Sequence, residues 1–251
     1  IENFSAKAGW GVLMDVRSGE VIALASLPDF NPNRPGGVSA DHWRNRVMSD
    51  RYELGSAFKP ITIAAALEQG SVDMGARFDV SRPIDVGGWS IADYSRKKPV
   101  LTLSEVVQYS SNIGTVQVAR QISVEKFSAT LAELGLTEEL RTELPETRKP
   151  SYSEVWRPAE LASVSYGHGI AVTPLQLTAA FSAVVNGGHY HKPTFVADTT
   201  GQVRKVFSED TSQQMRIMLR RAVTDGTGRN ADVDGFYVIG KTATADKPVN
   251  G

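Results

Sequence analysis

The sequence predicts an α+β fold. Two strand-like segments, residues 10–15 and 20–26, open the chain, and a third, residues 236–244, lies near its end. Between about residues 56 and 223, several segments carry the start and stop signals of helices. Strands before and after a helical middle are typical of an α+β domain, so we expect the N-terminal strands to pair with the C-terminal one.

Length and composition narrow the class of protein. The 251 residues are enough for one large domain or two small ones. With 41% hydrophobic residues, 22% charged residues and a net charge of −1, nothing favours binding to nucleic acid or to an anionic membrane. The absence of cysteine excludes disulfides, thiolate metal sites and a cysteine nucleophile. No apolar run is long enough to span a membrane, and no signal peptide opens the chain.

The first elements follow from turn and periodicity signals. Residues 16–19 supply turn chemistry between the two strands and predict a hairpin. Residues 27–37 are rich in proline, asparagine and glycine and are expected to form a loop. Residues 56–68 are apolar nearly all the way round, which predicts a buried helix that ends at Gly70. Pro60 fits only its first turn.

The remaining elements are mostly helical. Residues 71–100 and 137–157 contain proline and many polar residues, so we expect irregular connections there. Two capping boxes, Thr102 with Glu105 and Thr173 with Gln176, mark helix starts. Together with N-cap serines and terminal glycines, they predict helices at residues 102–107, 113–121, 123–134, 173–186 and 208–223.

Ser56 and Lys59 are the candidate nucleophile and base. Residues three apart share a helix face, so the two side chains can meet at the start of the buried helix. Burial lowers the proton affinity of a lysine, and a serine needs a base before it can attack. The same spacing occurs at Ser95–Lys98 and Ser123–Lys126, but without a buried helix behind it. Taken alone, Ser56 could instead be an N-cap beside a solvated lysine.

Two further polar groups can complete such a site. Ser110 and Asn112 lie in a predicted interhelical loop, from which they could relay a proton and hold a substrate amide. Lys241 and Thr242 lie on the predicted closing strand, where they could receive a carboxylate. The alternatives are a polar interhelical turn and an exposed strand edge.

Together and in this order, these motifs resemble those of the penicillin-recognising serine acyltransferases, which are the penicillin-binding proteins and the serine β-lactamases. Longer segments resemble the transpeptidase domain of class B penicillin-binding proteins. The short segment between Ile91 and Ser110 is most similar to that of the division-associated (septal) members. The similar segments are residues 44–60, 91–93, 109–114, 166–177 and 226–228.

The resemblance implies a fold and a location. The fold is penicillin-binding/serine β-lactamase-like, with an antiparallel sheet, helices on both of its faces and an all-helical subdomain. Residues 1–251 would form the transpeptidase domain, which we expect to be incomplete at its C-terminus and separated from an N-terminal anchor and pedestal. The anchor would hold the protein at the periplasmic face of the bacterial inner membrane, where divisome membrane proteins are its expected partners.

The resemblance also implies a peptidoglycan D,D-transpeptidase that needs neither a metal nor a cofactor. Its substrates would be stem peptides ending in D-Ala-D-Ala, and β-lactam antibiotics would acylate it. The backbone N–H groups of Ser56 and Thr244 would form the oxyanion hole. The implied roles are nucleophile for Ser56, general base for Lys59, proton relay for Ser110, orientation for Asn112, and binding of the substrate carboxylate for Lys241, Thr242 and Thr244.

One departure and two alternatives remain. Ala243 stands where the family usually has glycine, and a methyl group facing the cleft would weaken substrate and β-lactam binding. A serine β-lactamase or D,D-carboxypeptidase would use the same motifs with water, although Glu160 lacks the Glu-x-x-Leu-Asn pattern of the commonest lactamases. A non-catalytic β-lactam sensor is the other alternative. His168 is interpreted as structural, and residues 189–191 as a surface loop with too few ligands for a metal.

Overall fold

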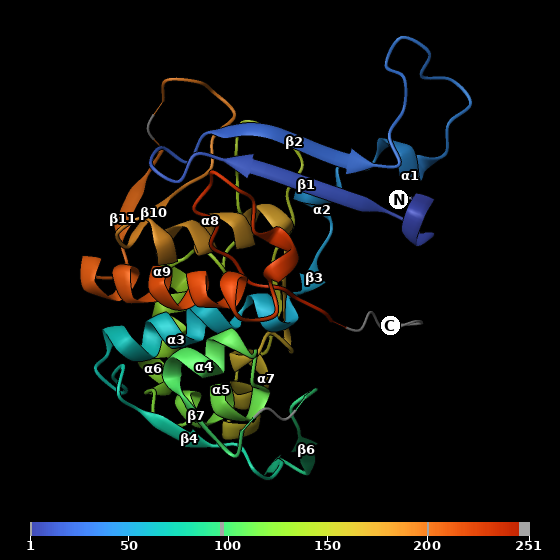
Figure 1. The fold of residues 1–251 in the computed structure, drawn as a ribbon. Helices are drawn as coiled ribbons and strands as arrows, with labels where there is room; N and C mark the ends of the chain where they lie inside the picture. Colours follow the sequence, from blue (N-terminus) through green and yellow to red (C-terminus); the bar gives the residue numbers. More distant parts are fainter. Residues whose placement is uncertain (1, 96–97, 200, 246–251) are drawn as a thin grey trace.

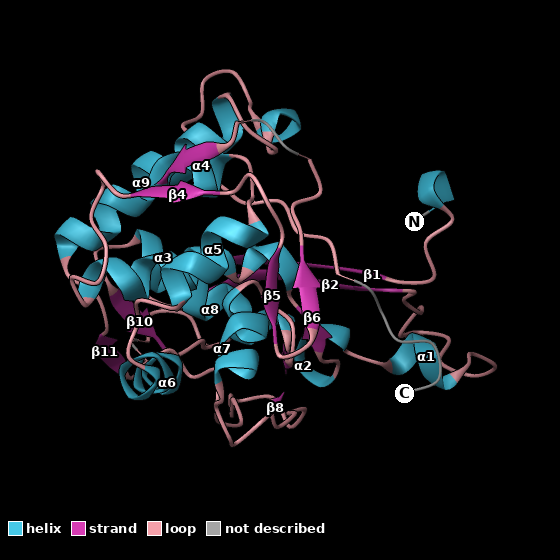
Figure 2. Ribbon diagram, turned by 90° about the horizontal axis from the view of Figure 1, so that it is seen from below, coloured by secondary structure: helices cyan, strands magenta, loops and turns pink. Residues whose placement is uncertain are grey.

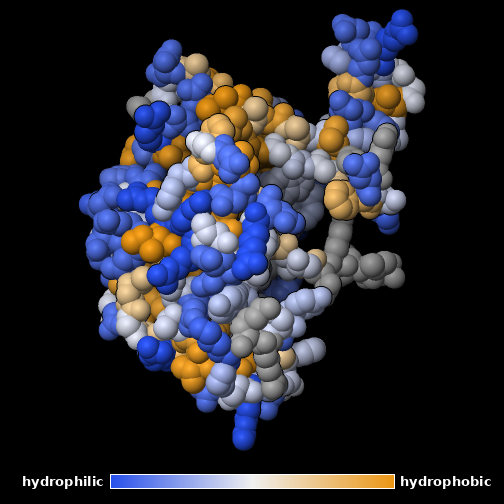
Figure 3. All heavy atoms as spheres, viewed as in Figure 1, coloured by the Kyte–Doolittle hydropathy of each residue, from blue (hydrophilic) through white to orange (hydrophobic). Residues whose placement is uncertain are grey.

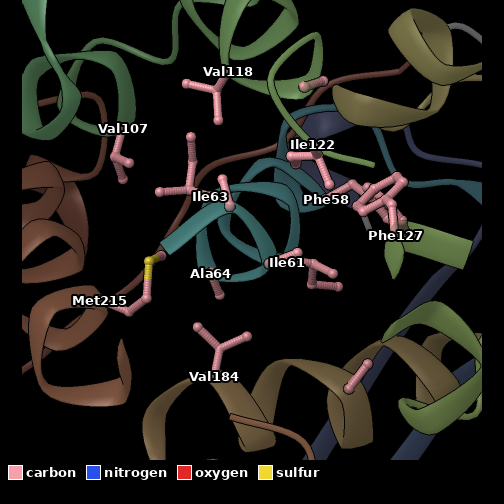
Figure 4. Close-up of a cluster of buried hydrophobic side chains, with 14 of the residues drawn as sticks. Phe58, Ile61, Ile63, Ala64, Val107, Val118, Ile122, Phe127, Val184 and Met215 are labelled. Carbon is pink, nitrogen blue, oxygen red and sulfur yellow. The ribbon is translucent and has the colours of Figure 1, made fainter. Parts of the chain in front are cut away.

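Helix α3 (Lys59–Glu68) is the centre of the fold. The computed structural model describes residues 2–95, 98–199 and 201–245. Every residue of α3 from Lys59 to Ala66 is buried, as the all-round apolar pattern predicts. Figure 4 shows its apolar side chains surrounded by side chains from neighbouring helices, among them Val107, Val184 and Met215. The helix that begins three residues after Ser56 is therefore fixed on all sides.

The other helices pack around α3. It contacts α5, α6, α8 and α9, and α4 in turn packs on α9. Figure 1 shows α8 and α9 on one side of α3 and α4 to α7 on the other. The bounds are α1 Ala40–Trp43, α2 Arg46–Ser49, α4 Leu103–Gln108, α5 Asn112–Ala119, α6 Val124–Glu133, α7 Pro158–Ser165, α8 Pro174–Val185 and α9 Glu209–Thr224. The predicted helices at 102–107, 113–121, 123–134, 173–186 and 208–223 are confirmed; α1, α2 and α7 were not predicted.

The predicted N-terminal hairpin is confirmed. Strands β1 (Gly9–Met14) and β2 (Val21–Leu27) pair antiparallel in the register Gly9↔Leu27. The hairpin packs on α8 and α2. On its other side Leu13 and Ile22 are more than half exposed, and Figure 3 shows hydrophobic side chains gathered over this end of the molecule. The sheet thus has one face on the helices and one face uncovered among the described residues.

The prediction of a closing strand is wrong. Residues 236–244 form no strand, and no backbone ladder joins them to β1 in the part of the chain that the structure describes. Two of their backbone groups bond to α9 instead: Arg220 Nη1 donates to the Val238 carbonyl at 2.8 Å, and the Gly240 N–H donates to the Leu219 carbonyl at 3.5 Å. Strand-forming composition does not produce a strand where the backbone groups find other partners.

Residues 71–100 are more regular than predicted. Strands β5 (Ile84–Val86) and β6 (Trp89–Ile91) form a tight hairpin across Gly87 and Gly88, both at positive φ, as two-residue hairpin loops require. Figure 2 shows this hairpin beside α5 and α7. It matters for function because the chain leaving β6 reaches the start of α5.

The other strands are short, with two or three residues each. Residues 189–191, interpreted as a surface loop, form β10, whose central Tyr190 is buried. No cluster of three metal-ligating side chains is present among the described residues, nor is any of their helices long and apolar enough to cross a membrane. The remaining strands are β3 Tyr52–Glu53, β4 Arg77–Asp79, β7 Val100–Thr102, β8 Ser151–Tyr152, β9 Ile170–Val172 and β11 Val203–Lys205, and the pairs are β4–β7, β10–β11 and β3–β9–β8.

Candidate active site

Ser56 lies in a single 3-10 turn, Gly55–Ala57, that leads directly into α3. The residue capping α3 is Phe58, and Lys59 is only 1% exposed. Neither half of the alternative interpretation, an N-cap serine beside a solvated lysine, therefore applies here. By contrast, the hydroxyl of Ser123 accepts a hydrogen bond from the Lys126 N–H, so the N-cap predicted for that serine is confirmed.

Lys59 is held by the loop before α5. Its Nζ donates to the Ser110 carbonyl at 2.5 Å, to Asn112 Oδ1 at 2.7 Å and to Ser110 Oγ at 3.2 Å. Burial, together with the positive charge of Lys241, lowers the pKa of Lys59 to about 7, and the carboxylate of Asp93 opposes this shift. A large share of this buried amine is therefore unprotonated near neutral pH and able to accept a proton.

The Ser110–Asn112 loop is fixed from both sides. Asp93, which follows β6, accepts hydrogen bonds from Ser111 Oγ at 2.7 Å and from the Ile113 N–H at 3.0 Å. Asn112 Nδ2 donates to the Ala92 carbonyl at 2.9 Å, so its Oδ1 faces Lys59. Ser110 has φ of 60°, a conformation that costs energy for a residue other than glycine and is characteristic of functional sites. The loop is thus preorganised around Lys59.

The third motif, residues 241–244, lies close to the Ser110–Asn112 loop without forming a strand. Thr242 Oγ1 donates to Thr227 Oγ1 at 2.8 Å, and the Thr227 N–H donates to the Gln108 carbonyl at 3.4 Å. Through Thr227, the 241–245 segment is therefore tied to the end of α4, two residues before Ser110. Lys241 Nζ donates to the Thr242 carbonyl at 2.9 Å, and burial lowers the pKa of Lys241 to about 8.

Close backbone packing places the turn that carries Ser56. Gly55 donates from its N–H to the Gly167 carbonyl at 3.0 Å, and a Cβ on Gly167 would overlap the backbone of Gly55. A Cβ on Gly55 would overlap the Thr244 carbonyl. Both glycines have positive φ. The residue preceding Ser56 is thereby held between the Tyr166–Gly169 turn and the third motif.

These segments enclose one cleft of about 620 Å³. Five of the seven predicted site residues line it: Ser56, Ser110, Asn112, Thr242 and Thr244. Lys59 lies beneath it, and Lys241 lines an adjacent, more apolar cavity of about 320 Å³ behind the third motif. The other residues lining the cleft are Tyr94, Ser95, Tyr109, Tyr166, His168, Thr227, Ala243 and Ala245.

Three residues that the structure places at the site were assigned no catalytic or binding role from the sequence. Asp93 organises the start of α5, and Thr227 holds Thr242. His168, interpreted as structural, lines the cleft, and its Nδ1 lies 3.1 Å from Glu53 Oε2. Asp93 and Thr227 fall in segments that resemble the family, which was a usable signal; the pairing of His168 with a glutamate 115 residues away was not visible from spacing.

Comparisons with known proteins agree with this geometry. The family model described as the penicillin binding protein transpeptidase domain matches residues 9–250. The chain is 38% identical over 98% of its length to the probable peptidoglycan D,D-transpeptidase FtsI of Caulobacter vibrioides, and 32% identical over 96% to the peptidoglycan D,D-transpeptidase FtsI of Escherichia coli. It spans 43% and 42% of those two proteins, less than half of each.

A solved structure is similar throughout. The apo structure of the TP domain of penicillin-binding protein 3 from Burkholderia pseudomallei matches with a TM-score of 0.88 and 32% identity, covering 99% of this chain and 72% of that one. This likeness confirms the predicted fold class. With the family model matching nearly the whole chain, it follows that this protein belongs to the family of penicillin-binding-protein transpeptidase domains.

Proposed function

We propose that this domain is a serine D,D-transpeptidase that cross-links peptidoglycan stem peptides. The observation that carries the proposal is the buried amine of Lys59, hydrogen-bonded to Ser110 and Asn112 at the base of the cleft that Ser56 lines. Both FtsI relatives are named for this activity. A buried lysine beside a serine at a cleft is the arrangement that activates a nucleophile without histidine.

In the first half of the reaction, Ser56 Oγ attacks the carbonyl of the penultimate D-alanine. The hydroxyl proton passes to Lys59 Nζ, which is a competent base because burial lowers its pKa to about 7. As the bond between carbonyl carbon and nitrogen breaks, Lys59 returns the proton through Ser110 Oγ, 3.2 Å away, to the nitrogen of the departing D-alanine. Asn112 keeps the amine aligned throughout.

The opposite wall of the cleft binds the charged end of the substrate. Thr242 and Thr244 line the cleft, and the ammonium group of Lys241 lies behind them with a pKa lowered to about 8. We propose that these groups receive the terminal carboxylate, for which a β-lactam carboxylate substitutes. The backbone N–H groups of Ser56 and Thr244 are the proposed oxyanion hole, supported by the close approach of Gly55 to the Thr244 carbonyl.

We further propose the setting of this activity. Similarity to proteins named FtsI supports a role in cell division, at the periplasmic face of the bacterial inner membrane. We propose that its partners are divisome membrane proteins.

Transfer from a synthetic stem peptide tests the function. The chain is incubated with a pentapeptide ending in D-Ala-D-Ala and a D-amino acid as the acceptor amine, and the products are identified by mass. We expect release of D-alanine and a new amide to the acceptor, both lost in Ser56→Ala. Release of D-alanine with water as the only acceptor would make the protein a carboxypeptidase, and no release together with no penicillin adduct would refute a covalent mechanism.

A further inference from the structure

A glutamate and a histidine form a pair at the wall of the cleft. His168 Nδ1 lies 3.1 Å from Glu53 Oε2, and the other oxygen, Glu53 Oε1, accepts from the Gly169 N–H at 2.9 Å. The ring of Tyr166 stands edge-on to the imidazole, with 5.0 Å between the centroids. Both paired side chains are about one third exposed, so the pair is held firmly yet open to the solvent of the cleft.

The backbone brings this pair close to the nucleophile. Glu53 ends β3, which pairs with β9 through Glu53↔Ala171, and His168 lies in the turn just before β9. The preceding residue, Gly167, accepts the hydrogen bond of Gly55, the neighbour of Ser56. His168 and Ser56 therefore each follow one of two glycines in direct backbone contact, and both line the same cleft.

The hydrogen bond to Glu53 decides which ring nitrogen can react. An ionised carboxylate can only accept, so Nδ1 donates to Glu53, and the neutral imidazole carries its free lone pair on Nε2. Among the residues that the structure describes, Nε2 has no hydrogen-bond partner. A histidine oriented by a carboxylate with its second nitrogen free is the usual arrangement of a general base.

The acylation step leaves this base unused. Lys59 takes the proton of Ser56, and no atom of His168 is among its partners. The second half of a transpeptidation makes a separate demand, because an acceptor amine loses a proton when it forms an amide. Lys59 leaves acylation neutral, because its proton departs with D-alanine. Once it has taken a proton from solvent, it can protonate Ser56 Oγ but has no free lone pair for the amine proton, which then requires another acceptor.

We propose that His168, oriented by Glu53, receives the acceptor amine and takes its proton in the second half of the reaction. The inference rests on the proposed transpeptidase function. The amine nitrogen bonds to the acyl carbon while its proton moves to His168 Nε2; the bond from that carbon to Ser56 Oγ then breaks, and Lys59, which has taken up a proton from solvent after acylation, gives that proton to Oγ. His168 releases its proton to solvent, and neutral Lys59 is ready for the next acylation. His168 is thus a catalytic residue and Glu53 a positioning residue.

The test separates the two half-reactions. Acylation is measured with a fluorescent penicillin, and transfer is measured with the stem pentapeptide and a D-amino acid acceptor. We expect His168→Gln to lower the rate of transfer at least tenfold more than it lowers the rate of acylation, since general bases contribute roughly 100-fold or more. Glu53→Gln should show the same selective loss, but a smaller one. External imidazole should restore transfer to His168→Ala without increasing transfer by the unchanged chain.

Controls make every outcome decisive. His42→Gln replaces a histidine in α1, outside the cleft, and should leave the ratio of transfer to acylation unchanged. Thermal unfolding of each variant checks that it folds. Equal losses of acylation and transfer in His168→Gln, or no loss of transfer, would overturn the inference. Acylation without any transfer by the unchanged chain would instead refute the proposed transpeptidase function, which separates the two failures.

Discussion

Lys59 Nζ donates a hydrogen bond of 2.7 Å to Asn112 Oδ1, and this contact joins the start of α3 to the start of α5. The amide of Asn112 is itself fixed by the Ala92 carbonyl, 2.9 Å from Nδ2. The proposed base is therefore positioned by a side chain whose own orientation is determined by the chain leaving the β5–β6 hairpin. Two helices and a hairpin converge on one amine.

Asn112→Ala should slow acylation of Ser56 at least tenfold. The substitution removes an acceptor of Lys59 and leaves the Ala92 carbonyl without its donor, so the amine loses its alignment. The rate is measured from the adduct with a fluorescent penicillin. Asn186→Ala is the control, because Asn186 likewise donates from its side chain to backbone carbonyls, those of Val16 and His189, but lies outside the cleft. Equal acylation rates in both variants would contradict the role of Asn112.

Acylation should depend on pH through Lys59 and Lys241. Because the pKa of Lys59 is lowered to about 7, the rate should rise with pH through that value as the neutral amine accumulates. Lys241 should lose its charge above about 8 and weaken carboxylate binding there. Removing this charge in Lys241→Gln raises the pKa of Lys59, so the rising limb should move to higher pH.

The control for this shift is Lys126→Gln, which removes a lysine outside the cleft in α6. It should leave the midpoint of the rising limb in place. A midpoint that stays fixed or moves to lower pH in Lys241→Gln would show that the two lysines do not interact.

Gly167→Ala should destabilise the domain and slow acylation. The residue has φ of +90°, and its Cβ would overlap the backbone of Gly55. Gly88 is a matched control: it has φ of +86°, but its Cβ would meet no atom within 4 Å. Gly88→Ala should cost about 1–2 kcal/mol for the left-handed backbone alone, and Gly167→Ala at least about 2 kcal/mol more. Similar unfolding free energies for the two variants, measured in urea, would disprove the close packing.

Thr227→Val should weaken the support of Thr242 in the wall of the cleft. It removes the hydroxyl that accepts from Thr242 Oγ1 at 2.8 Å, a hydrogen bond worth about 1 kcal/mol. The expected loss in acylation efficiency with penicillin is therefore about fivefold. Thr130→Val is the control, because Thr130 in α6 hydrogen-bonds only within its own helix. An unchanged efficiency in Thr227→Val would mean that Thr242 needs no such support.

The elements around the nucleophile could be predicted because their signals are local. The burial of α3 follows from the unbroken apolar run after Ser56, and the start of α4 follows from the capping box of Thr102 and Glu105. The order of three short motifs then pointed to one cleft. The structure brings Ser56, Ser110, Asn112 and Thr242 together there, as expected.

The features that could not be predicted from the sequence depend on contacts between distant segments. Residues 236–244 have the composition of a strand, but their backbone meets α9, and propensity cannot reveal that partner. The approach of Glu53 to His168 arises from the pairing of β3 with β9, which no spacing in the sequence indicates. The β5–β6 hairpin could have been predicted, since Gly87 and Gly88 between Val86 and Trp89 are a strong turn signal.

The most direct test of the central claim is the mass of the protein after incubation with penicillin. The account predicts one covalent adduct on the unchanged chain, located on Ser56 by peptide mapping and absent from Ser56→Ala. Ser123 also stands three residues before a lysine, but it caps α6, so Ser123→Ala should still form the adduct. An adduct that persists in Ser56→Ala, or none on the folded unchanged chain, would contradict Ser56 as the nucleophile.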